Sequence, residues 1–98
     1  MLREEIAEIN PEALLLDGFD EAIIGMAERI NLGPVVAYDV DKIIEILAKD
    51  MEVDIDDLTD GSSVEDVQIS MAFDYFYYNI QGAWMGDYTP IFISKLEI

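Results

Sequence analysis

The clearest periodic pattern in the chain lies at residues 40–50. Apolar side chains recur there with the i, i+3, i+4, i+7 spacing of one helix face: Val40, Ile43, Ile44, Leu47 and Met51. Asp39 precedes the run at a position that caps a helix, and Lys49 lies near its end, where a cation is favoured. The spacing predicts a helix over 40–50.

A second helix is predicted over 64–81. Ser62 with Glu65 has the spacing of a capping box, and Ser63 with Asp66 is a poorer variant of it. The main apolar stripe is formed by Ile69, Phe73, Phe76 and Ile80. Residues 2–9 form one or two further helical turns before Asn10-Pro11, and we expect 1–12 to be a peripheral segment of a single domain, 1–98.

Residues 19–32 fit two interpretations. Their apolar positions match a helical stripe, but 21–29 also reads as a strand that pairs with 35–38 across a turn at 31–34. Residues 91–96 form another predicted strand. The expected fold is α+β, a small antiparallel sheet of about three strands with the two main helices packed on one face. The alternative is a mostly helical bundle.

Composition narrows the function classes. Of 98 residues, 22 are Asp or Glu and 5 are Lys or Arg, so the formal net charge is −17. Such a chain is repelled by phosphates, which argues against direct binding to nucleic acid or to an anionic membrane. Apolar runs of about four residues are far shorter than the roughly 20 that span a bilayer. The acidic start of the chain is unlike a secretory signal.

Catalytic chemistry has little support in the residue types. The chain has no Cys and no His, which excludes disulfides, thiolate nucleophiles and zinc–thiolate sites and removes the commonest proton shuttle. Pairs of carboxylates are unavoidable among 22 acids and therefore carry no signal. We predict no enzyme activity, no catalytic residue, no metal site and no cofactor.

Acidic residues are densest between 50 and 66. The candidate partner-binding residues there are Glu52, Asp54, Asp56, Asp57, Asp60, Glu65 and Asp66. In an extended segment, Glu52, Asp54 and Asp56 would share one face at about 6.8 Å spacing, close to the spacing of phosphates on one nucleic-acid strand. One interpretation is a nucleic-acid mimic that binds Lys and Arg. The other is a solvated acidic loop.

A calcium loop is a poor match for the same segment. An EF-hand needs acids at positions 1, 3 and 5 and Gly at position 6. A loop starting at Asp54 places Leu58 at position 5, and one starting at Asp56 places Leu58 at position 3. Both registers fail.

Aromatic residues cluster between 73 and 84. They cannot all face inward from one helix, because successive side chains spread around its axis. The candidate interface residues are Tyr75, Tyr77, Tyr78 and Trp84. Core packing, a homodimer face and a partner-binding face are the three interpretations, since Tyr and Trp are enriched at interfaces.

Several stretches resemble one known family. They are 13–25 (ALLLDGFDEAIIG), 36–39 (VAYD), 79–87 (NIQGAWMGD) and 89–92 (TPIF). In this order the stretches resemble a family of small proteins encoded by tailed bacteriophages. The resemblance implies a small α+β fold, favours the hairpin over the helix at 19–32, and implies a role in the cytoplasm of an infected bacterium. It implies no catalytic residue.

Two functions follow as expectations. The first is an acidic binding protein that inhibits or modulates a basic nucleic-acid-handling host protein, such as a nuclease, a defence component or a transcription component. The second is a self-associating structural or accessory protein, a homodimer whose acidity serves solubility.

Overall fold

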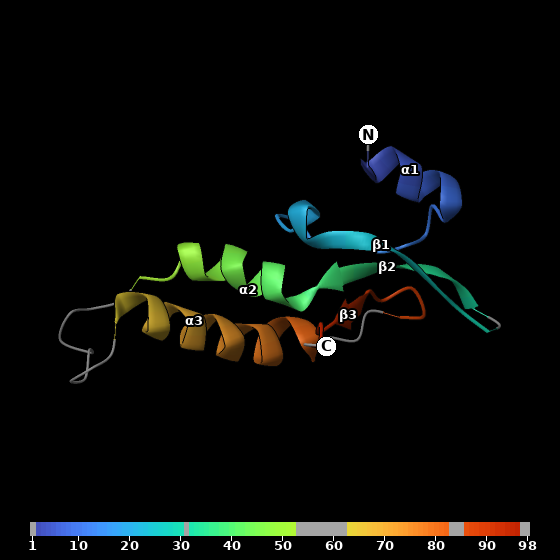
Figure 1. The fold of residues 1–98 in the computed structure, drawn as a ribbon. Coiled ribbons are helices and arrows are strands. Elements are labelled where there is room, and N and C mark those ends of the chain that lie inside the picture. Colours follow the sequence, from blue (N-terminus) through green and yellow to red (C-terminus); the bar gives the residue numbers. More distant parts are fainter. Residues whose placement is uncertain (1, 31, 53–62, 83–85, 97–98) are drawn as a thin grey trace. The chain divides into compact units, whose positions relative to one another are not determined.

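The computed structural model describes residues 2–30, 32–52, 63–82 and 86–96. The chain divides into two compact units, which we call the sheet unit (1–40 and 84–98) and the helical unit (41–83). The elements in chain order are α1 (Leu2–Ile9), η1 (Asp20–Ala22), β1 (Ile23–Arg29), β2 (Leu32–Asp39), α2 (Val40–Lys49), α3 (Val64–Tyr75), η3 (Phe76–Gln81) and β3 (Ile91–Ile93) (Figure 1). The predicted α+β class is confirmed, and the helical-bundle alternative is wrong.

The sheet has three strands in the order β1-β2-β3. β1 and β2 form the predicted antiparallel hairpin, with Met26 opposite Val36 and Ala27 opposite Val35. β3 pairs with β2 in the parallel direction, so the prediction of a wholly antiparallel sheet is wrong. A parallel partner needs a crossover of a dozen or more residues, and the connection over residues 40–90 is long enough for one.

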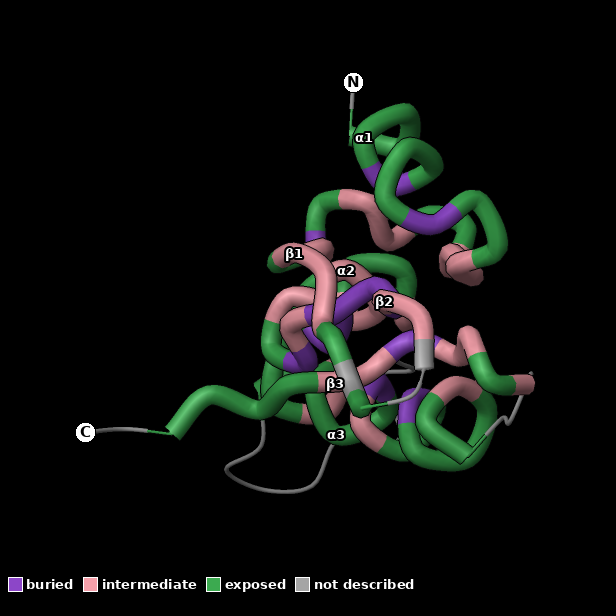
Figure 2. The backbone as a smooth tube through the Cα atoms, turned by 90° about the vertical axis from the view of Figure 1, so that its right-hand side faces the viewer, coloured by how far each residue is buried: buried purple, intermediate pink, exposed green. Residues whose placement is uncertain are grey.

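β2 is the buried strand of the sheet unit. Its residues 35–38 are all buried (Figure 2). Tyr38 is fully buried, and its ring stacks on Phe92 of β3 with 6.1 Å between the centroids. Burial raises the pKa of the Tyr38 phenol, and its oxygen accepts a 2.8 Å hydrogen bond from the backbone N–H of Leu16. The polar end of this large side chain is therefore satisfied inside the core.

Within the sheet unit, two polar residues hold the N-terminal segment to the residues that follow it. Arg3 on α1 donates two hydrogen bonds of 2.8 Å to the carboxylate of Asp20 in η1. Asn10, which is buried, donates from Nδ2 to the carbonyl of Pro34 at 2.7 Å and accepts from the N–H of Glu12 at 3.1 Å. The two bonds of Asn10 satisfy both the donor and the acceptor of its buried amide.

The helical unit follows the predicted ranges. α2 occupies 40–49, and α3 with η3 occupies 64–81, the last six residues being a π-helix. Ser63 is the N-cap of α3, and its hydroxyl accepts from the N–H of Asp66 at 3.1 Å. Ser62 of the better predicted capping box lies outside the described residues. In the described part of the chain, no helix has the length and apolarity needed to cross a membrane.

Candidate interaction surfaces

The basic side chains that the structure describes form ion pairs within the protein. Each of the four Lys and Arg side chains that the structure describes lies in an ion pair: Arg3 with Asp20 and Asp17, Lys42 and Lys49 with Glu45, and Lys95 with Asp39. The closest N–O distances of these pairs are between 2.8 and 3.7 Å. Over the whole chain, 22 acids stand against 5 bases, so carboxylates outnumber cations by 17.

The ion pair of Arg3 with Asp20 helps to keep the carboxylate of Asp20 ionised. The hydrogen bonds from Arg3, and then its charge, hold the pKa of Asp20 below its usual range. The same contact raises the pKa of Arg3. A carboxylate with a well-aligned guanidinium partner thus stays charged at lower pH than one without it.

The predicted partner-binding acids are only partly described. Glu52 is exposed after α2, and Glu65 and Asp66 are exposed in the first turn of α3. An acid in the first turn is favoured by the partial positive charge of the helix N-terminus. The remaining four, Asp54, Asp56, Asp57 and Asp60, lie outside the described residues. The structure therefore places Glu65 and Asp66 next to each other at one helix end.

Three predicted interface tyrosines are exposed on α3 and η3. The exposed fractions are 47% for Tyr75, 50% for Tyr77 and 85% for Tyr78, whereas Phe76 is buried at 1%. The expectation that not all these aromatics fit the core is confirmed, and core packing holds for Phe76. Tyr77 packs edge-to-face on Phe76, with the ring centroids 5.3 Å apart. Trp84 lies outside the described residues.

Tyr75 and Tyr78 also line a shallow hollow of the helical unit. Its volume is about 360 Å³, and it is formed by Met51, Met71, Asp74, Tyr75, Tyr78 and Asn79. Met71 is 38% exposed, so the hollow has an apolar side that the chain leaves in contact with solvent. Amphipathic rings beside an open apolar surface are typical of interaction faces.

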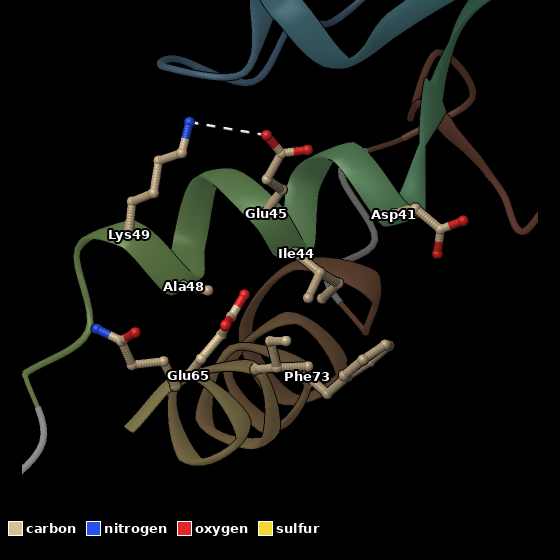
Figure 3. A pocket seen from close by; sticks show the side chains of 9 residues that line it. Asp41, Ile44, Glu45, Ala48, Lys49, Glu65 and Phe73 are labelled. Carbon is tan, nitrogen blue, oxygen red and sulfur yellow. Dashed lines mark ion pairs between the residues drawn. The ribbon is translucent and has the colours of Figure 1, made fainter. Parts of the chain in front are cut away.

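A larger groove runs between α2 and α3 inside the helical unit (Figure 3). Its volume is about 540 Å³, and it is lined by Asp41, Ile44, Glu45, Ala48, Lys49, Glu65, Gln68, Ile69 and Phe73. Four of these residues are apolar and form what we call the floor: Ile44, Ala48, Ile69 and Phe73. The charged ones form the rim: Asp41, Glu45, Lys49 and Glu65. In Figure 3 the carboxylate of Glu65 extends from α3 toward α2.

One hydrogen bond holds the two sides of this groove together at one end. Gln68 on α3 donates from Nε2 to the carbonyl of Met51, which follows α2, at 2.8 Å. Along the α2 side of the rim, Lys49 pairs with Glu45 of the same helix at 3.7 Å. Glu45 is also paired with Lys42 at 3.3 Å, so two ammonium groups lie beside this one carboxylate of the rim.

The sequence pattern missed this groove. The sequence pattern places Ile69 on the main apolar stripe of the predicted helix 64–81. In the structure its side chain is 38% exposed and lies on the groove floor. The sequence signal for such a groove is that apolar residues occur on several sides of α3. Three of them, Val64, Ile69 and Met71, are exposed in the structure. A helix that is apolar on several faces has more apolar surface than one neighbour covers.

No family model, curated protein or solved structure matches the chain.

Proposed function

We propose that this protein is a non-enzymatic binding protein that inhibits or modulates a basic, nucleic-acid-handling host protein. The observation that carries the proposal is the use of the described Lys and Arg side chains in internal ion pairs, against a formal net charge of −17. Carboxylates in this surplus are available to pair with Lys and Arg side chains of another molecule. In keeping with its resemblance to phage proteins, its place of action is the cytoplasm of an infected bacterium.

The mode of binding is competition for a surface that recognises phosphate. Grooves that bind nucleic acid are lined by Lys and Arg, and carboxylates can take the positions of phosphate oxygens in charge-assisted hydrogen bonds. The acidic segment 50–66 offers the densest charge. Within it, Glu52 is exposed after α2, and Glu65 and Asp66 are exposed in the first turn of α3.

Capture from bacterial lysate tests the proposal. The tagged protein is incubated with lysate at about 0.1 M and about 0.6 M salt, and retained proteins are identified by mass spectrometry. We expect one dominant nucleic-acid-binding protein that is lost at the higher salt and displaced by added duplex DNA. Retention that neither salt nor DNA reduces contradicts the proposal.

A matched pair of triple variants separates local from overall charge. D54N/D56N/D57N and E5Q/E8Q/E21Q each remove three carboxylates, the first from the acidic segment and the second from exposed positions in the sheet unit. We expect the first variant to lose most of the captured partner and the second to retain it. Equal losses would mean that net charge alone governs binding.

The exposed tyrosines favour a second function, self-association. Tyr78 is 85% exposed beside the apolar hollow, which suits a face shared by two copies. Sedimentation velocity of Tyr78→Arg compared with Gln81→Arg tests it, because both variants add one positive charge to exposed positions of η3. Self-association predicts a dimer for the parent chain and for Gln81→Arg, and a monomer for Tyr78→Arg.

A further inference from the structure

We propose that the groove between α2 and α3 receives a cationic amphipathic helix of the partner protein. This inference rests on the proposed function, because it specifies the element of a basic partner that the acidic protein binds. Binding in the groove would add an apolar contact, which depends on the shape of the partner helix, to the attraction between carboxylates and cations.

The apolar floor of the groove is covered on one side only. Ile44 of α2 is 5% exposed, whereas Ile69 of α3, on the same floor, is 38% exposed. The apolar surface of the groove is therefore closed on the side of α2 and open on the side of α3. Covering such a surface with apolar side chains is favourable by roughly 25 cal/mol per Å².

The groove is long enough to hold two turns of a helix. Its lining on α2 runs from Asp41 to Lys49, which at about 1.5 Å per residue is about 12 Å. An incoming helix with a pitch of about 5.4 Å makes just over two turns over that length. Apolar residues at i, i+3 or i+4, and i+7 can then lie along the floor, which is how a helix usually binds in a groove.

The charge of the rim selects among helices. Three carboxylates, Asp41, Glu45 and Glu65, line the groove together with the ammonium group of Lys49, and Lys42, outside the lining, pairs with Glu45 at 3.3 Å. Lys and Arg side chains that flank an apolar stripe can extend to such carboxylates while their methylene chains lie on the floor. A second copy of this chain would bring a formal charge of −17 to the same rim, so like-charge repulsion disfavours it.

The test uses the full chain and a synthetic helix. The probe is a peptide of about 18 residues with Leu at i, i+3, i+4 and i+7 positions and Lys elsewhere. A scrambled peptide of identical composition has the same charge but no apolar stripe. Affinities are measured by isothermal titration calorimetry, and we expect the amphipathic peptide to bind at least about tenfold more tightly.

Two residues on α3 supply a matched pair of variants. Ile69 and Met71 are both 38% exposed, but only Ile69 lines the groove. Ile69→Lys places a cation on the floor and should reduce affinity for the amphipathic peptide about tenfold. Met71→Lys adds the same charge and should change the affinity by less than about twofold.

A second pair of variants tests the groove without changing its apolar floor, so the result does not depend on whether Ile69→Lys folds. Glu65→Lys and Asp66→Lys make the same charge change at exposed positions in the first turn of α3, and only Glu65 lines the groove. Circular dichroism checks that each variant folds. We expect Glu65→Lys to weaken the amphipathic peptide more than Asp66→Lys does.

The outcomes separate this inference from the proposed function. Equal binding of both peptides, with Ile69→Lys and Met71→Lys alike, overturns the groove as the site and leaves recognition by charge intact. Equal binding of a third peptide with Glu in place of Lys overturns the role of the acidic rim. Binding of neither Lys peptide at about 0.05 M salt overturns the inference and removes the electrostatic basis of the proposed function as well.

Discussion

The backbone N–H of Leu16 donates a 2.8 Å hydrogen bond to the phenolic oxygen of Tyr38, a residue that is fully buried in β2. Twenty-two residues separate the two groups in the chain. The bond attaches the loop before η1 to the central strand of the sheet unit. It also gives a partly buried backbone donor its partner, which folding requires of such groups.

Replacing Tyr38 by Phe should destabilise the protein by about 1 kcal/mol. The ring and its stacking on Phe92 remain, but the N–H of Leu16 loses its acceptor. Urea denaturation followed by circular dichroism measures the change. Tyr78→Phe removes a hydroxyl from a side chain that is 85% exposed and should alter stability by less than about 0.5 kcal/mol.

Asp20 should make stability depend on pH on the acid side. Its pKa is lowered in the folded protein by the hydrogen bonds and charge of Arg3. A group with a lowered folded pKa stabilises the fold above its unfolded pKa of about 3.9, and the stabilisation is lost as pH falls through the folded pKa. Asp20→Asn should therefore lower the urea midpoint at pH 7, and the difference from the parent should shrink toward pH 3.

The control for this prediction is the neighbouring carboxylate. Glu21→Gln makes the same charge change at an exposed position beside Asp20. In a chain with a formal charge of −17, removing one carboxylate relieves repulsion, so Glu21→Gln should be neutral or stabilising at pH 7. An identical response of the two variants would show that the Arg3 contact contributes nothing to stability.

Gly33 should not accept a Cβ. An added methyl group there would lie 3.0 Å from Cε1 of Tyr88 and 3.2 Å from Nδ2 of Asn10, which is fixed by its bond to Pro34. We expect Gly33→Ala to cost about 1–2 kcal/mol, because a tightly packed site must shift. Gly25→Ala in the partner strand meets no atom within 4 Å and should be neutral or slightly stabilising. Thermal unfolding of the two variants decides between these expectations.

Local patterns in the sequence are enough to predict the helices, but they leave the hairpin open. The predicted ranges 40–50 and 64–81 agree with α2 and with α3 plus η3. The range of α2 follows from its apolar face of helical period, and the start of α3 follows from the capping pair Ser63 and Asp66. At 19–32 the pattern fits a helix and a hairpin equally, the resemblance to phage proteins favours the hairpin, and the structure has the hairpin. The π-helical geometry of 76–81 left no signal, since its apolar spacing differs little from that of an α-helix.

The local sequence pattern does not determine which distant strands pair or which helix positions other elements cover. The parallel pairing of β3 with β2 depends on where the chain returns after 40–90, and no local residue encodes that. Likewise, Ile69 and Phe73 share a helical stripe with Phe76, yet only Phe76 is fully buried, because burial depends on which neighbours cover each position. The groove was missed for the same reason.

Added salt should stabilise this protein. At a formal charge of −17 the folded chain repels itself more than the expanded chain does, and the Debye length falls from about 10 Å at 0.1 M salt to about 3 Å at 1 M. We expect the melting temperature to rise between about 0.05 M and about 0.5 M NaCl, and the rise to be smaller for E5Q/E8Q/E21Q, which carries three fewer charges. Differential scanning calorimetry at the two salt concentrations measures both. A melting temperature that salt leaves unchanged would mean that the carboxylates are too far apart to repel one another. The surface would then lack the charge density on which binding to a phosphate-recognising partner depends.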